Sequence, residues 1–154
     1  MKTLLLVAGG RSGSDFFQSL LDGHPQVLQF PGTIKTNKKF IKTLLLKNPD
    51  NISSNFIKDY IHFFDSRLGW GKVERHDQLG EDRKQHYIVD QEKFKFFFLE
   101  MYKKKFKANH NNKIFNTMLI LHLAYAKTCG QDISRKKIMI INCHLVEWAE
   151  FLGK

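Results

Sequence analysis

A glycine- and serine-rich turn near the amino terminus holds the residues best suited to bind an anion. Residues 9–14 read Gly-Gly-Arg-Ser-Gly-Ser and follow directly after the apolar run Leu4–Ala8. Glycines let a backbone approach an anion closely, and the first turn of a following helix presents unpaired N–H groups. Arg11 adds a planar cation that can bind two phosphate or sulfate oxygens at once, and Ser12 and Ser14 add hydroxyl donors. On this chemistry alone, the segment fits a phosphate- or sulfate-binding loop and a plain turn capped by a serine equally well.

His144 is the second residue with chemical potential, because it comes directly after the apolar run Lys137–Cys143. Ligands of open α/β sheets collect at the carboxyl ends of strands, and a histidine can take the proton of an attacking hydroxyl. The same residue could instead cap a following helix, over about Leu145–Leu152, or hydrogen bond within the core. No Cys or His cluster has the spacing of a metal site. We therefore expect no bound metal ion. We also expect Cys129 and Cys143 to be buried free thiols.

The glycine loop does not match two common nucleotide-binding patterns. A Walker A loop needs Lys followed by Ser or Thr after its last glycine, whereas Gly13 is followed by Ser14 and Asp15. The Rossmann pattern GxGxxG is absent as well. The sequence therefore disfavours ATP or GTP hydrolysis and dinucleotide binding. A nucleotide or phosphate-ester kinase with a degenerate phosphate loop stays open as an alternative.

The loop and the residues behind it resemble the amino-terminal signature of sulfotransferases, most closely the carbohydrate-type and bacterial members. The resemblance rests on three stretches in one frame, Gly10–Ser14, Phe16–Leu21 and His24–Val27. It implies transfer of a sulfuryl group from 3′-phosphoadenosine 5′-phosphosulfate (PAPS) to a hydroxyl or amine acceptor, which could be a small molecule or a carbohydrate. It implies that Arg11 is catalytic and that PAPS binds to the loop, at Gly10, Arg11, Ser12, Gly13, Ser14, Asp15 and Phe16.

A shorter similarity concerns the end of the second apolar run. Asn142-Cys143-His144-Leu145 is similar to the Lys-Thr-His-Leu stretch of cytosolic sulfotransferases, whose histidine is the general base, so the resemblance implies that role for His144. Two features depart from the family. Asp15 stands where Ser or Thr is usual, and a carboxylate beside a phosphate site repels the ligand unless it is turned away or paired. The Arg-x-Pro motif of the 3′-phosphate site is absent. We therefore expect a carboxyl-terminally truncated domain, and an inactive sulfotransferase fragment is a further alternative.

The spacing of apolar residues predicts the elements that hold the candidate residues in place. Thr3–Ala8 reads as a parallel strand covered on both faces, and Val27–Phe30 and Lys137–Cys143 read as further strands. The predicted helices are one that opens at Ser14, with Phe16, Phe17, Leu20 and Leu21 at helical spacing, one capped by Thr36, and three over about Ser53–Arg67, Asp90–Lys105 and Lys113–Thr128. A long loop is predicted over Leu68–Gln85. This order predicts one α/β domain over residues 1–154, a P-loop-like, helix-rich, three-layer fold around a central parallel sheet.

The charge of the chain limits its partners but says little about its fold. The 154 residues include 25 Lys and Arg against 15 Asp and Glu, which gives a formal net charge of +10. A nucleic acid, an anionic membrane surface or a small polyanionic cofactor all fit this charge. The densest basic cluster, Lys103–Lys107, has no nucleic-acid-binding motif beside it and is typical of a solvated helix face. We expect a cytoplasmic protein with no nucleic-acid partner and no membrane span.

Overall fold

The computed structural model describes residues 1–7, 13–34, 37–68, 79, 81–108 and 112–143. Its strands β1 (Lys2–Val7), β2 (Val27–Leu28) and β3 (Ile138–Cys143) form a three-stranded parallel sheet in the order β1-β3-β2. The described helices are α1 (Ser14–Leu20), α2 (Lys38–Leu44), α3 (Pro49–Asp59), α4 (Ile61–Phe64), α6 (Gln91–Ala108), α7 (Lys113–Thr128) and the short 3-10 helix η1 (Ile133–Arg135). The predicted α/β class with a parallel sheet is confirmed.

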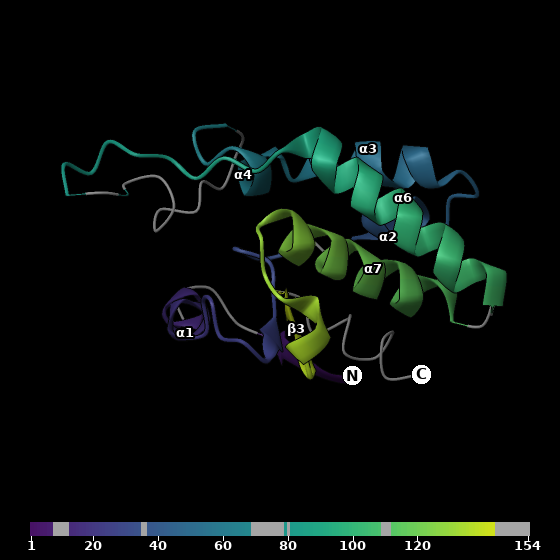
Figure 1. The fold of residues 1–154 in the computed structure, drawn as a ribbon, viewed down its shortest axis with the longest axis horizontal. Coiled ribbons are helices and arrows are strands. Elements are labelled where there is room, and N and C mark those ends of the chain that lie inside the picture. The colour runs from purple at the N-terminus through teal and green to yellow at the C-terminus, as the bar shows by residue number, and fades with distance from the viewer. Residues whose placement is uncertain (8–12, 35–36, 69–78, 80, 109–111, 144–154) are drawn as a thin grey trace.

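Helices lie on both faces of this sheet. α7 lies next to the sheet and α6 packs on the outer side of α7, away from the strands (Figure 1). Met139 and Ile141 of β3 belong to the core on that face. Successive side chains of a strand point to opposite faces, so Asn142 points to the other face. There its side chain contacts Gln18 of α1.

The main core is aromatic and lies between α7 and the helices stacked beyond it. The Phe30 ring centroid is 5.1 Å from that of Phe56 and 3.8 Å from that of His122. Tyr125 of α7 donates a hydrogen bond of 2.6 Å to the carbonyl oxygen of Phe63, in α4. Offset and edge-on aromatic pairs add stabilisation beyond the area that they bury. These contacts hold α7 and the segment after β2 against α3 and α4.

β1 is more exposed than its apolar sequence predicts. Leu4 is 47% exposed and Val7 is 38% exposed, whereas Met139 to Cys143 of β3 are all buried. Among the described strands β1 pairs only with β3, so it forms one edge of the sheet. The prediction that the first strand is covered on both faces is therefore wrong.

α1 begins at Ser14 as predicted, but its apolar residues do not form its buried face. Ser14 and Gln18 are buried, while Phe16, Phe17 and Leu20 are exposed. Residues four apart lie on the same side of a helix, so Ser14 and Gln18 form one stripe that faces the sheet. The buried stripe of this helix is polar, because it lies against the polar end of β3.

The other predicted helices are confirmed in kind, with changed boundaries. The helix predicted over Ser53–Arg67 is two helices, α3 and α4. α3 begins at Pro49, behind the N-cap Asn48, and ends before Tyr60. α2 is capped by Asn37, whose Oδ1 accepts a 2.9 Å hydrogen bond from the Phe40 N–H.

α6 starts where predicted but continues to Ala108, beyond the predicted end near Lys105, and α7 has both predicted ends. The Asp90 carboxylate accepts a bond from the Lys93 N–H at the start of α6. The predicted cap Thr36, most of the predicted loop Leu68–Gln85 and the predicted helix Leu145–Leu152 lie outside the described residues.

Candidate functional site at the carboxyl edge of the sheet

The carboxyl ends of β1 and β3 lie side by side. Their parallel register pairs Leu6 with Asn142 and Val7 with Cys143. Val7 is the last described residue before the glycine loop, and Cys143 is the last before His144. The two segments that the sequence predicts to be functional therefore follow directly after partner residues of neighbouring strands. This edge is where open α/β sheets bind their ligands.

Four of the predicted site residues lie outside the described residues, namely Gly10, Arg11, Ser12 and His144. Gly13 is described, and it is the N-cap of α1, with φ 78° and ψ 12°. Its carbonyl oxygen accepts a 2.9 Å hydrogen bond from the Phe17 N–H. A Cβ added to Gly13 would meet no atom of the described residues within 4 Å, so among these residues the left-handed backbone, and not crowding, favours glycine here. The open space also leaves the Gly13 backbone approachable.

The remaining predicted site residues lie in the first turn of α1. Ser14 is buried on the face that meets the sheet, and Asp15 is exposed. A carboxylate in the first turn favours the helix dipole. The Phe16 side chain is 70% exposed. The structure therefore separates these residues, with Ser14 turned toward β3 and the side chains of Asp15 and Phe16 turned toward solvent.

A buried amide network beneath α1 was not predicted from the sequence. Asn142 Nδ2 donates hydrogen bonds to Gln18 Oε1 at 2.9 Å and to Thr33 Oγ1 at 3.2 Å. The backbone carbonyl of Asn142 accepts a 3.0 Å bond from the Ile34 N–H. Asn142 is 2% exposed and Gln18 is 1% exposed. The network ties α1 and the segment after β2 to the end of β3, so it holds the first turn of α1 in a fixed position at this edge.

The network leaves one polar atom unsatisfied. Asn142 Oδ1 is buried and has no hydrogen-bond partner among the described residues. A buried acceptor without a partner costs free energy. The same holds, among the described residues, for Gln29 Oε1, Thr117 Oγ1 and His122 Nε2, so the unsatisfied atom does not by itself mark a functional site. A signal for this network exists in the sequence, because Asn142 is the only amide in the apolar run Ile138–Cys143 and Gln18 follows Ser14 by one helical turn.

The described residues at this edge fit an anion better than a metal ion. Gly13 offers an approachable backbone at the start of a helix, and Ser14 carries a hydroxyl. Among the described residues, no group of three or more His, Cys, Asp or Glu side chains is placed to hold a metal ion. Asp15 is the one feature at the start of α1 that disfavours an anion, and its side chain is exposed.

The comparisons with known proteins add no relative. Neither the family models, nor the curated proteins, nor the solved structures contain a match to this chain.

The strand order is informative by itself. In Rossmann and flavodoxin-like sheets the first strand pairs with the second. Here β3 lies between β1 and β2, which agrees with the absence of the Rossmann pattern.

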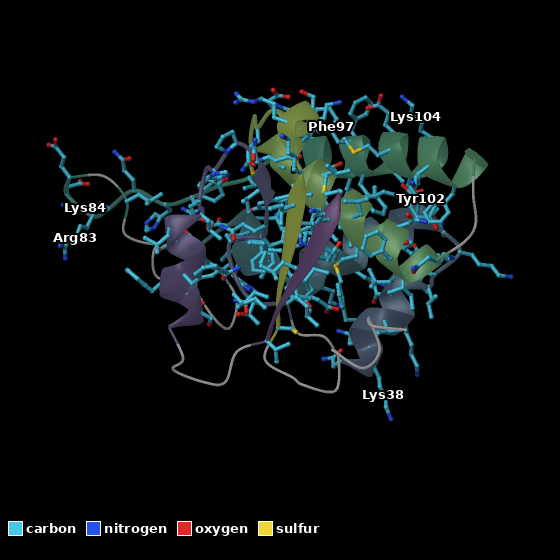
Figure 2. The ribbon with its side chains drawn as sticks, turned by 90° about the horizontal axis from the view of Figure 1, so that it is seen from below. Lys38, Arg83, Lys84, Phe97, Tyr102 and Lys104 are labelled. Carbon is cyan, nitrogen blue, oxygen red and sulfur yellow. The ribbon has the colours of Figure 1, made fainter. Side chains whose placement is uncertain are left out.

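The described helices also bear on the predicted partners. None of them has the length and apolar character needed to cross a bilayer. Lys103, Lys104 and Lys105 of α6 are exposed, and Figure 2 shows Lys104 directed away from the body of the molecule. This agrees with the interpretation of the basic cluster as a solvated helix face.

Proposed function

We propose that this chain is a sulfotransferase of P-loop-like fold that uses PAPS to sulfate a hydroxyl or amine acceptor. The observation that carries the proposal is the register that pairs Val7 with Cys143. It brings together the starting points of the two segments that resemble sulfotransferases, although these segments stand at opposite ends of the sequence. The register supports the proposal only together with the resemblance of Gly10–Ser14, Phe16–Leu21 and His24–Val27 to the family signature.

In this proposal each residue of the site has a separate task. The loop amides, Arg11, Ser12 and Ser14 hold the phosphosulfate and neutralise its oxygens, because charge-assisted hydrogen bonds are the strongest that a protein can make to such groups. PAPS supplies an activated sulfuryl group. Gly13 provides the left-handed turn into α1, and Asn142 and Gln18 keep that turn fixed. The exposed Asp15 carboxylate lies in the first turn of α1, so this proposal expects a repulsive contribution to ligand binding from it.

His144 is the proposed general base. The acceptor oxygen forms a bond to sulfur while the bond from sulfur to the bridging oxygen of the phosphosulfate breaks. The proton of the acceptor passes to the imidazole of His144, and the desulfated nucleotide leaves with the bridging oxygen. Transfers of this kind depend mainly on positioning and on neutralisation of charge, which the loop residues are proposed to provide.

The direct test is calorimetric titration of the 154-residue chain with 3′-phosphoadenosine 5′-phosphate, the desulfated cofactor, without magnesium. We expect saturable binding that Arg11→Ala weakens by about 100-fold, because the substitution removes a bidentate charge-assisted contact. Arg135→Ala removes an exposed arginine from the other end of β3 and serves as the matched control.

Three outcomes would overturn the proposal. Unchanged affinity in Arg11→Ala would show that the loop does not hold the nucleotide. Equal losses in Arg11→Ala and Arg135→Ala would show binding by net charge alone. Binding of magnesium–ATP in preference to the desulfated cofactor would favour the kinase alternative. Circular dichroism of each variant shows whether the fold is retained.

A further inference from the structure

Alternate residues of the edge strand β1 direct their backbone groups to opposite sides. The Lys2 N–H donates a 2.9 Å hydrogen bond to the Lys137 carbonyl oxygen, so the backbone of Lys2 points toward β3. This direction repeats at every second residue of a strand, so Leu4 and Leu6 also use their N–H and C=O groups to bond with β3. Every second residue of β1 is therefore held by the sheet.

The residues between them, Thr3, Leu5 and Val7, direct their N–H and C=O groups away from β3. No described strand pairs with β1 on that side, and Figure 2 shows β1, the purple strand, beside β3 at one side of the sheet. The side chains of Lys2 to Leu4 and of Val7 are exposed. A strand edge of this kind is a template for pairing with another strand.

This edge lacks the features with which proteins usually protect exposed strands. Such protection comes from charged residues, from proline or from a bulge. The segment Thr3–Val7 contains no charged residue and no proline, and its register with β3 runs without interruption. It carries apolar side chains instead, and Leu4 is 47% exposed and Val7 38% exposed. The segment is therefore suited to pairing with a further strand.

The spacing of these residues fits a second copy of the same strand. When two β1 strands run antiparallel about a twofold axis at Leu5, Leu5 meets Leu5 and Thr3 meets Val7 of the second copy. Each of these pairs joins two residues whose backbone groups point outward, so each pair exchanges two hydrogen bonds. Leu4 then lies opposite Leu6 of the second copy, and the leucines of both copies form one apolar patch. No charged pair arises within this register.

We propose that β1 is an interface between two copies of this chain, which join their sheets by antiparallel pairing of Thr3–Val7 about Leu5. The interface does not depend on the sulfotransferase proposal. Val7 of one copy lies beside Thr3 of the other, so the two candidate sites lie at opposite ends of the interface. A six-residue strand forms a small interface, and the net charge of +10 on each copy opposes association. We therefore expect a reversible dimer with a Kd on the order of 10 µM.

The test is sedimentation velocity of the chain at concentrations from about 1 µM to about 500 µM, which span the expected Kd. The mean mass should rise from 18.1 kDa toward twice that value, and added salt should strengthen the dimer by screening the net charge. Leu4→Lys should weaken the dimer at least about tenfold, because it brings two cations together on one face. Leu20→Lys makes the same change at a position of α1 that is 65% exposed, and it should leave the dimer unchanged.

A second variant removes only a backbone donor. Thr3→Pro deletes an N–H group that points away from β3, a position that proline tolerates in edge strands, and it should also weaken the dimer. Circular dichroism of each variant shows whether the fold is retained.

Amide hydrogen exchange tests the register directly. The amides of Leu5 and Val7 should exchange more slowly as the concentration of the chain rises, whereas those of Leu4 and Leu6 should be protected at every concentration. A mass of one copy at all concentrations, or growth beyond two copies, would overturn the proposal. Equal effects of Leu4→Lys and Leu20→Lys, or exchange at Leu5 and Val7 that does not change with concentration, would overturn it as well.

Discussion

At the residue scale, His122 makes the stability of the fold depend on pH. It lies in α7, fully buried against Phe30, and its Nδ1 is 2.8 Å from the carbonyl oxygen of Met118. Burial lowers the pKa of His122 from 6.5 to about 4, because the charged imidazolium would lose its hydration there. The folded chain therefore excludes a proton that the unfolded chain binds.

The free energy of unfolding should accordingly fall as pH falls from about 6.5 to about 4. The stability that depends on a neutral His122 is fully present above its unfolded pKa. Below its folded pKa this stability is lost, which lowers the free energy of unfolding by up to about 3 kcal/mol. Urea unfolding measured across this pH range checks the prediction. His122→Gln removes the titrating ring and should flatten the dependence, while His24→Gln, at an exposed turn, should not. A slope in His122→Gln as steep as that of the unaltered chain would contradict this account.

At the element scale, the attachment of α1 depends on two amides. Gln18 of α1 and Asn142 of β3 share a buried hydrogen bond of 2.9 Å. The exposed apolar residues on the same helix, Phe16 and Leu20, contribute little to its attachment because they remain in water. The first turn of the candidate site is therefore held mainly by polar contacts.

A double-mutant cycle tests this attachment. Gln18→Ala and Asn142→Ala should each lower the free energy of unfolding, and their interaction energy should be about 1 kcal/mol. Ser19→Ala, on the exposed side of α1, gives the control cycle with Asn142→Ala and should show additive effects. The account of α1 fails if the effects of Gln18→Ala and Asn142→Ala are also additive.

Local signals predicted most of the elements, and long-range contacts explain the failures. The Asp90 cap and the apolar spacing along Lys113–Thr128 act within one helix, so α6 and α7 were predicted well. The start of α3 was missed although Asn48-Pro49 is a local start signal. The burial of β1 and the orientation of α1 depend on neighbouring elements, which apolar spacing in one segment does not report.

At the scale of the whole molecule, the sequence predicted the candidate residues but could not show that the strands before them are neighbours in the sheet. The loop after Val7 and the residue after Cys143 come from opposite ends of the chain, and only the sheet register relates them. The contribution of Gln18 and Asn142 was missed for the same reason, because each reads locally as an isolated polar residue.

The net charge of +10 creates a competing mode of binding at this scale. A polyanionic nucleotide is attracted to any basic surface, and the exposed Lys103, Lys104 and Lys105 of α6 form such a surface. Affinity alone does not distinguish this attraction from binding in the glycine loop. The position of the bound nucleotide on the protein distinguishes the two modes of binding.

The most direct measurement is therefore a site-resolved NMR titration of the ¹⁵N-labelled chain with 3′-phosphoadenosine 5′-phosphate. Our account predicts saturable amide shifts that are largest at Gly13, Ser14 and Cys143, the described residues that border the candidate site. It predicts small shifts at Lys103, Lys104 and Lys105. Shifts that are largest at these lysines and do not saturate, with Gly13 and Ser14 unchanged, would contradict the assignment of the glycine loop as the nucleotide site.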